Sequence, residues 1–162
     1  MRYRGPLYRA LNPVWARNPL SGEGARRLGG RFNPRGTPAL YTSTSIMTAL
    51  REANQIGTLQ PTTLVSYEAD LGPIFDAEDV ATLNAFDMTP ELLAADDWRV
   101  RMAHEGTAPT QDFARRLIAA GFAGMRILSF ARGTGPDDIN IVLWSWDAKR
   151  LVLNDKEGRL RR

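Results

Sequence analysis

The residues best suited to chemistry are Arg31, Tyr41 and Glu52, which lie in one stretch that begins at Leu20 and is rich in glycine. An arginine presents a planar fork of donors to an anion, a tyrosine ring presents a flat surface to a ligand, and a fixed carboxylate can offset a developing positive charge. Each residue type alone is common on protein surfaces, and a glutamate on a helix usually faces solvent. Their grouping behind the glycines predicts the core of a nucleotide site.

Glycines and prolines are dense between Pro19 and Pro38, just before Tyr41. Such density marks backbone that bends sharply or approaches another group closely. We therefore expect neither a helix nor a long strand in this segment. The Ala-Leu-Tyr sequence at residues 39–41 then predicts a short apolar strand.

A helix is predicted from Ser45 to Gln55, with Thr42 or Ser43 as its N-cap. Glu52 comes three residues after Ala49 and therefore lies beside the apolar stripe of this helix rather than opposite it, where its carboxylate could face a cleft. The stripe follows the i, i+3, i+4, i+7 spacing of one helix face and consists of Ile46, Ala49, Leu50 and Ala53.

The string GGRFNPRGTPALYTSTS, followed by a glutamate on a helix, resembles the RES domain, a family of bacterial toxins named for its Arg, Glu and Ser. The order and spacing of Arg31, Tyr41 and Glu52 are typical of that family. The resemblance begins at Tyr8-Arg9-Ala10, passes through LSGEG and GGRFN, and reaches LSF at Ser129 and the run that starts at Asn140. It therefore spans nearly the whole chain.

The resemblance implies a compact α+β fold similar to the diphtheria-toxin type of ADP-ribosyltransferase, with NAD+ as substrate. Members of the family cleave the bond between nicotinamide and ribose, and the ADP-ribose passes to water, to phosphate or to a protein. They act as toxins of two-gene systems. The implied partner is an antitoxin with an Xre-like helix-turn-helix region, whose C-terminal part blocks the active site.

On this resemblance, Glu52, Arg31 and Tyr41 are the candidate catalytic residues. A carboxylate at Glu52 would stabilise the oxocarbenium-like ribose that forms as nicotinamide leaves. The ring of Tyr41 would stack on the nicotinamide or its ribose and so position the substrate. Arg31, with backbone N–H groups around Gly30, would bind the pyrophosphate or the ribose on the nicotinamide side.

Four further residues are candidates for binding the ligand. Arg9 and Tyr8 would complete the floor of the site, although Arg9 is equally consistent with a structural salt bridge. Ser129, in a predicted strand from Met125 to Phe130, is expected to bond the substrate or Glu52. Asn140 begins the next predicted strand and either bonds the ligand or ends a turn.

Ser129 is not expected to act as a nucleophile, because a serine nucleophile needs a nearby base. The single histidine, His104, lies in a polar helical stretch, DDWRVRMAHEG, and no catalytic role is predicted for it. The carboxylates between Asp76 and Asp97 lack the regular loop spacing of a calcium site and are expected to be solvated surface groups. With no cysteine in the chain, no metal site is predicted.

The rest of the chain is expected to be scaffold. Its predicted strands cover residues 62–69, 125–130 and 139–146, with 150–154 as a further candidate. Thr89 and Pro90 have the N-cap and first-position pattern of a helix start, and residues 110–120 form an amphipathic pattern that ends at Gly121. Short strands of mixed order with helices between them predict an α+β fold, and the regular pattern of a dinucleotide-binding Rossmann fold is absent.

Length and composition limit the number of domains and indicate where the protein acts. A chain of 162 residues fits one domain, taken as residues 1–162, with a core large enough to need no disulfides. The start of the chain has no apolar signal region and no segment has the length of a membrane span, so we expect a cytoplasmic protein that does not bind membranes.

The net charge of +3 rests on arginine, since Lys149 and Lys156 are the only lysines. Arginine suits phosphate and carboxylate ligands, but a high-GC genome also favours it. The basic end of residues 149–162 could contact nucleic acid or an acidic partner, but we favour a solvated terminus. Trp144 and Trp146 lie in an apolar strand without interleaved basic residues, so direct nucleic-acid binding is not predicted.

The sequence leaves two alternatives open, one for the acceptor of ADP-ribose and one between an enzyme and a binding module. An exposed, flat mouth around Tyr41 and Glu52 would favour a protein as acceptor of ADP-ribose, and a deep, closed pocket would favour a small acceptor. A module that binds NAD+ or another nucleotide without turnover is the alternative to an enzyme. The presence of Arg31, Tyr41, Glu52 and Ser129 together argues for turnover.

Overall fold

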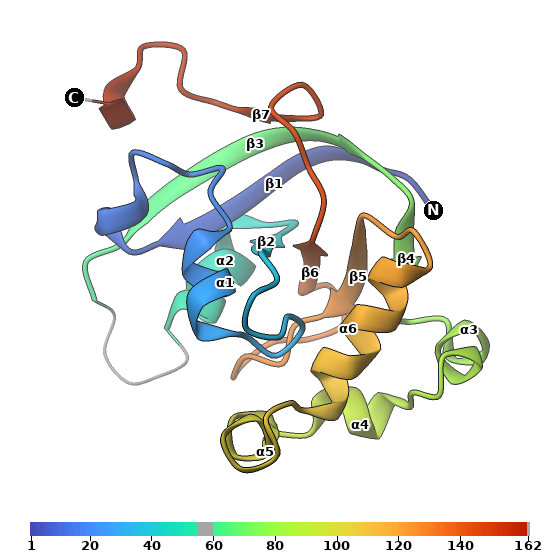
Figure 1. Cartoon of the computed structure of the whole chain (residues 1–162). Helices are drawn as coiled ribbons and strands as arrows, with labels where there is room; N and C mark the ends of the chain where they lie inside the picture. Colours follow the sequence, from blue (N-terminus) through green and yellow to red (C-terminus); the bar gives the residue numbers. More distant parts are fainter. Residues whose placement is uncertain (55–59, 162) are drawn as a thin grey trace.

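A mixed sheet of seven strands, in the order β4-β5-β6-β2-β1-β3-β7, forms the centre of the protein (Figure 1). The computed structural model describes residues 1–54 and 60–161. Strands β4 and β5 pair in parallel, and the other neighbouring strands pair antiparallel. The strands are β1 (Tyr3–Leu11), β2 (Leu40–Ser43), β3 (Thr63–Leu71), β4 (Ile74–Asp76), β5 (Gly124–Leu128), β6 (Ile139–Leu143) and β7 (Leu151–Leu153).

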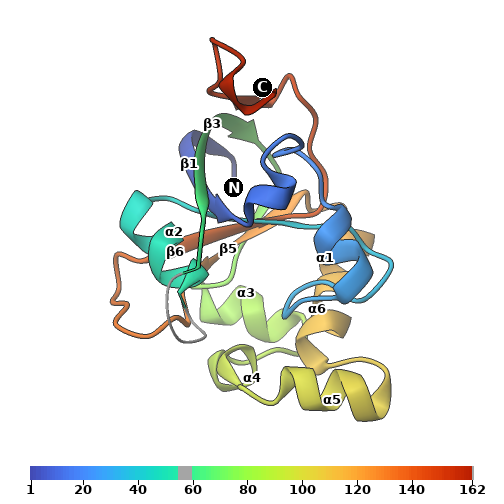
Figure 2. The ribbon, with the colours of Figure 1, turned by 90° about the vertical axis from the view of Figure 1, so that its left-hand side faces the viewer.

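The helices lie around this sheet. Figure 2 shows α3, α4, α5 and α6 gathered at one end of the molecule, away from β1 and β3. The α-helices of the described residues are α1 (Glu23–Leu28), α2 (Ile46–Ala53), α3 (Val80–Ala85), α4 (Pro90–Ala94), α5 (Trp98–Glu105) and α6 (Pro109–Ala119), and short 3-10 helices cover Pro13–Trp15 and Arg159–Arg161. Among these described helices, none has the length and apolar character needed to cross a membrane.

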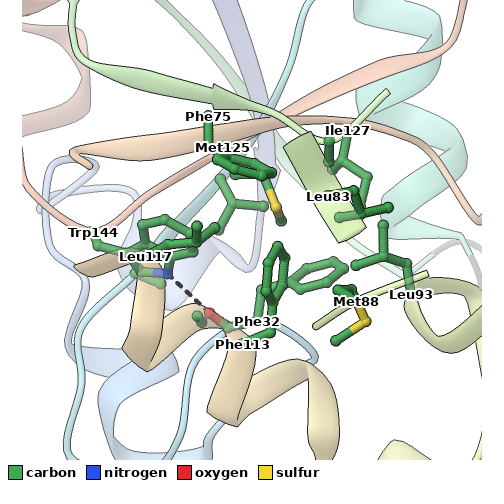
Figure 3. Close-up of a cluster of buried hydrophobic side chains, with 14 residues drawn as sticks. Phe32, Phe75, Leu83, Met88, Leu93, Phe113, Leu117, Met125, Ile127 and Trp144 are labelled. Atoms are coloured by element: carbon green, nitrogen blue, oxygen red, sulfur yellow. Dashed lines mark hydrogen bonds between the residues drawn. The ribbon is translucent and has the colours of Figure 1, made fainter. Parts of the chain in front are cut away.

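One hydrophobic cluster joins β4, β5 and β6 to α3, α4 and α6 (Figure 3). Phe75 belongs to this cluster and makes edge-to-face contacts with Phe86, Phe113 and Phe122 at centroid distances of 5.3 to 5.7 Å. The indole Nε1 of Trp144 donates a hydrogen bond of 2.9 Å to the carbonyl of Phe32. This bond fixes the glycine-rich turn, which carries Arg31, to the core.

A second cluster is formed by residues of β1, β2, β3, β4, β6 and β7. Leu7 and Leu11 of β1 are buried there against Tyr67 and Leu71 of β3 and Leu151 of β7. Nine consecutive residues of β1 pair with β3, from Tyr3 opposite Leu71 to Leu11 opposite Thr63. This long pairing fixes the position of Tyr8 and Arg9.

Several predicted elements are confirmed. Strand β3, helix α6 and the strand candidate that became β7 lie where the sequence placed them to within a few residues. Thr89 caps α4 by accepting a hydrogen bond from the N–H of Leu92, and Pro90 takes the first helical position. The expected mixture of short mixed and antiparallel strands with surrounding helices is also confirmed.

Other local predictions were wrong. Helix α1 lies inside the glycine-rich segment, and β1 was not predicted because Gly5 and Pro6 interrupt its pattern. Strand β2 continues to Ser43, so the N-cap of α2 is Ser45, whose Oγ accepts from the N–H of Thr48. Gln55, the predicted end of α2, lies outside the described residues.

Only part of the predicted apolar stripe of α2 faces the core, since Ala49 is buried and Leu50 is half-buried. Ile46 and Met47 are exposed, as is Ala53, whereas Thr48 and Ala49 are buried. The inner face therefore runs through Thr48, Ala49 and Glu52, and it is partly polar. Thr48 and Glu52 of this face form hydrogen bonds with Asp138 and Asn140.

Candidate active site

Nearly all the site residues predicted from the sequence line one cavity of about 490 Å³. Ser129 does not line it but contacts a residue that does, and His104 is exposed on α5 outside the lining. The predicted residues that line the cavity are Tyr8, Arg9, Gly30, Arg31, Tyr41, Glu52 and Asn140. Residues from three strands, a turn and a helix thus meet at one place.

Glu52 reaches the cavity from the last turn of α2. Its Oε1 accepts a hydrogen bond from Nδ2 of Asn140 at 2.6 Å and a short hydrogen bond from the hydroxyl of Ser129. Two donors on one oxygen hold the carboxylate in a fixed orientation, and bonds to a charged acceptor are stronger than neutral ones. The predicted contact between Ser129 and Glu52 is present.

The strand register explains why Asn140 lies under Glu52. Tyr8 of β1 is opposite Ser43 of β2, Ser43 is opposite Asn140 of β6, and Asn140 is opposite Ile127 of β5. Directly opposed residues point to the same face of a sheet, so these four side chains form one row. The hydroxyl of Ser43 donates to Oδ1 of Asn140 at 2.7 Å, which directs the Nδ2 group of Asn140 to Glu52.

Asp138 connects the helix that carries Glu52 to the segment that carries Ser129. Its Oδ1 accepts from the hydroxyl of Thr48 at 2.6 Å and from Nη1 of Arg51 at 2.8 Å, both on α2. Its backbone carbonyl accepts from the N–H of Ser129 at 2.8 Å. Hydrogen bonds to the charged form, the one from Thr48 first, lower the pKa of Asp138.

The hydroxyl of Tyr41 organises the glycine-rich turn. It donates to Oδ1 of Asn33 at 2.5 Å and accepts from the N–H of Phe32 at 3.1 Å. Burial of this hydroxyl raises the pKa of Tyr41 beyond its usual range, so the phenol stays neutral. Tyr41 as a whole is 36% exposed and lines the cavity, which leaves its ring available to a ligand.

Gly30 is needed for this arrangement. A Cβ at this position would lie 2.5 Å from the Tyr41 hydroxyl and 2.6 Å from Oδ1 of Asn33. The carbonyl of Gly30 accepts from Nε2 of the buried Gln111 at 2.9 Å. The turn is thus held on one side by β2 and on the other by α6.

Arg31 has both a structural contact and a place in the cavity wall. Its Nη1 donates to the carbonyls of Leu93 and Ala95 at 3.2 and 2.9 Å, at the end of α4. Its guanidinium lies 5.0 Å from the ring centroid of Phe130. The ion pair with Asp96 is long, 3.4 Å, and the Asp96 side chain is 96% exposed, so this charge is weakly compensated.

Arg9 and Tyr8 lie on β1 at the floor of the cavity. Nη1 of Arg9 donates to the carbonyl of Pro19 at 3.2 Å, and the hydroxyl of Tyr67 donates to the same oxygen at 2.5 Å. Within residues 1–54 and 60–161, Arg9 forms no ion pair, so the structural salt bridge considered for it is not found.

The carboxylates at the start of the acidic segment make structural contacts. Asp76 and Glu78 pair with Arg126, and Asp79 caps α3 by accepting from the N–H of Thr82 at 3.3 Å. The sequence predicted that these carboxylates are solvated surface groups. The structure shows that they also have partners within the protein. In the part of the chain that the structure describes, no cluster of three or more possible metal ligands occurs.

The sequence did not single out three residues that support the site. Asn33 holds Tyr41, Ser43 orients Asn140, and Asp138 connects α2 to Ser129. All three are small polar residues, a type common in turns and caps. Ser43 was taken for a helix cap, and only its place opposite Asn140 reveals its contact.

Comparison with protein families matches residues 6–162 to the RES domain. The chain belongs to the RES domain family. The resemblance read from GGRFN, Glu52 and Ser129 is therefore confirmed, and Arg31, Glu52 and Ser129 of this RES protein lie at or beside one cavity.

Among solved structures, this RES protein resembles a chain in the crystal structure of the Mycobacterium tuberculosis MbcT–MbcA toxin–antitoxin complex, with a TM-score of 0.74. The two sequences are 20% identical, and the alignment covers 96% of this chain and 84% of the other. At this identity the likeness shows a shared fold. Comparison with curated proteins gives no match.

Proposed function

We propose that this RES protein is the toxin of a toxin–antitoxin pair and that it cleaves the bond between nicotinamide and ribose in NAD+. The observation that carries the proposal is the Glu52 carboxylate, held at the cavity by Asn140 and Ser129. A carboxylate fixed in this way is preorganised to stabilise positive charge on a ribose. Membership of the RES family supports NAD+ as the substrate.

In this reaction, the bond from C1′ of the ribose to the nicotinamide nitrogen breaks and nicotinamide leaves with the electron pair. Glu52 faces the charge that develops on the ribose, while the exposed ring of Tyr41 provides a stacking surface. The acceptor then forms the new bond to C1′. A protein side chain gives ADP-ribosylation, whereas water or phosphate gives depletion of NAD+.

The proposal extends to the partner and the setting. A cognate antitoxin of the Xre-like helix-turn-helix type would cover the cavity and block access to Glu52, and the pair would act in the cytoplasm, where NAD+ is available. The chain of similar fold comes from a complex of a toxin with its antitoxin, which supports such a partner. The fold is further proposed to be of the diphtheria-toxin ADP-ribosyltransferase type.

The test is release of nicotinamide from NAD+ by the purified protein, with and without phosphate and with and without cell extract. The Glu52→Gln variant is nearly isosteric but cannot offset positive charge, so release and growth arrest should be lost while the fold is kept. Glu68→Gln, an exposed position on β3 outside the cavity lining, is the matched control and should release nicotinamide like the wild type.

Each outcome has a distinct meaning. Release that requires extract and labels one protein indicates an ADP-ribosyltransferase, and release in buffer or phosphate alone indicates an NAD+-depleting enzyme. No release by the wild type under any condition would favour a binding module without turnover. If the Glu52→Gln protein still arrests growth, Glu52 has no essential part in the mechanism.

A further inference from the structure

The cavity contains an excess of positive charge. Arg9, Arg31 and Arg99 line it, whereas Glu52 is the one carboxylate among its described lining residues. Arg99 belongs to α5, far along the chain from the other two, and was not predicted as a site residue. A cavity wall with this balance suits an anionic ligand, because bringing like charges together is unfavourable unless an anion lies between them.

Arg99 is held in a way that leaves its donors available. Its guanidinium lies 4.5 Å from the ring centroid of Trp98, which is 8% exposed and fixed in the protein. Among the described residues, its guanidinium has no ion pair and no hydrogen bond with a carboxylate, although Asp96 and Asp97 are close in sequence. Stacking on an aromatic face leaves the N–H edges of an arginine free to bind oxygen atoms.

Arg31 also lies over an aromatic ring, although its guanidinium in addition donates to the carbonyls of Leu93 and Ala95 and forms the long ion pair with Asp96. It lies over the ring of Phe130 at 5.0 Å, and both Phe130 and Trp98 line the cavity. Burial lowers the pKa of Arg31, and the nearby positive charge of Arg99 lowers it further. Both guanidinium groups line the same cavity, one on the glycine-rich turn and one on α5.

We propose that Arg31 and Arg99 together bind the diphosphate of the dinucleotide, with Arg99 and Trp98 forming a diphosphate subsite on α5. This inference rests on the proposed function, since it assigns part of the NAD+ molecule to a part of the same cavity. A diphosphate carries a negative charge on each phosphate, and two planar forks of donors match its oxygen atoms. Arg99 binds the substrate at a distance from the bond that breaks.

The test compares Arg99→Gln with Arg101→Gln. Arg101 lies on the same helix, pairs with Glu105 at 3.6 Å and does not line the cavity, so its substitution makes the same change in charge outside the site. Binding of ADP and of adenosine to the purified full chain is measured by calorimetry at low and high salt. Thermal unfolding of both variants checks that the fold is kept.

We expect Arg99→Gln to weaken ADP binding about tenfold, the loss typical of one charged hydrogen bond. The salt dependence of ADP binding should decrease, whereas adenosine binding should not change and Arg101→Gln should bind both ligands like the wild type. Equal ADP affinities of the two variants would overturn the proposal. So would a wild type that binds ADP no more tightly than adenosine.

Nicotinamide release separates this proposal from the proposed function. If the enzyme turns over NAD+, Arg99→Gln should raise KM about tenfold and leave kcat nearly unchanged, because uniform binding is lost far from the reacting bond. An unchanged KM would refute the subsite while the proposed function stands. ADP binding that depends on Arg99 in a protein without turnover would support the subsite and reject the proposed function.

Discussion

Asn140 donates a hydrogen bond of 2.6 Å to the carboxylate of Glu52, although 88 residues separate them in the chain. The bond joins strand β6, which carries Asn140, to helix α2, which carries Glu52. Ser43 fixes the direction of the Asn140 amide by donating to its oxygen at 2.7 Å. The orientation of Glu52 thus depends on the pairing of β2 with β6.

Asn140→Asp should abolish most of the activity with little change in shape. The substitution replaces the donor that faces Glu52 with an oxygen, and two carboxylates at this distance repel or share a proton. We expect nicotinamide release to fall on the order of a hundredfold, comparable with the loss of a donor that orients a reacting charge. Steady-state kinetics on NAD+ measures the effect.

Asn154→Asp is the matched control, since Asn154 is exposed and its amide bonds Ser66 outside the cavity. It adds the same negative charge and should leave kcat unchanged. Equal activities of the two variants would mean that the donor on Asn140 does not act through Glu52.

Tyr41→Phe should destabilise the protein by about 1–3 kcal/mol, because Oδ1 of Asn33 and the N–H of Phe32 would both lose their partner. Tyr3→Phe removes an exposed hydroxyl that bonds the carbonyl of Pro6, and its effect should stay within about 0.5 kcal/mol. Urea unfolding measures both changes. Similar losses for the two variants would show that the Tyr41 hydroxyl does not stabilise the turn.

Gly30→Ala should also destabilise the turn, because the added Cβ would meet the Tyr41 hydroxyl at 2.5 Å. Overpacking of this kind costs about 1–3 kcal/mol. Gly135→Ala is the control, since nothing lies within 4 Å of the Cβ that it would add. A melting temperature for Gly30→Ala equal to that of Gly135→Ala would indicate that the turn can move aside freely.

Local signals in the sequence predicted the elements that depend on neighbouring residues. The Thr89-Pro90 pair fixed the start of α4, and the apolar spacing before Gly121 identified α6. The contact between Ser129 and Glu52 was anticipated through the family resemblance. Local pattern alone gave no reason to expect it, because the two residues are 77 positions apart.

The parts that the sequence did not predict depend on tertiary contacts. Strand β1 contains Gly5 and Pro6, which weaken a strand pattern, and its pairing with β3 supplies the compensating hydrogen bonds. On α2 the apolar pattern predicted the inner face only in part, because the buried side includes Thr48, whose hydroxyl donates a hydrogen bond to Asp138. Hydrophobic periodicity contains no information on such polar contacts.

Asp138→Asn should loosen the helix that carries Glu52. Thr48 and Arg51 both donate to Oδ1 of Asp138, and the N–H of Gly135 donates to Oδ2 at 2.8 Å. An amide can satisfy one side of this arrangement but presents a donor to the other. We expect a lower free energy of unfolding and a lower kcat, since Glu52 follows Arg51 directly on α2.

The stability difference between wild type and Asp138→Asn should depend on pH. The pKa of Asp138 is lowered in the folded state from a value of 3.8, so its ionised form stabilises the protein above about pH 4 and this contribution is lost as the pH falls below that value. Urea unfolding between pH 7 and about pH 3 should therefore show the two proteins converging in acid. Asp137→Asn, at an exposed neighbouring position, should follow the wild type throughout. A difference that stays constant with pH would mean that Asp138 acts through its shape and not through its charge.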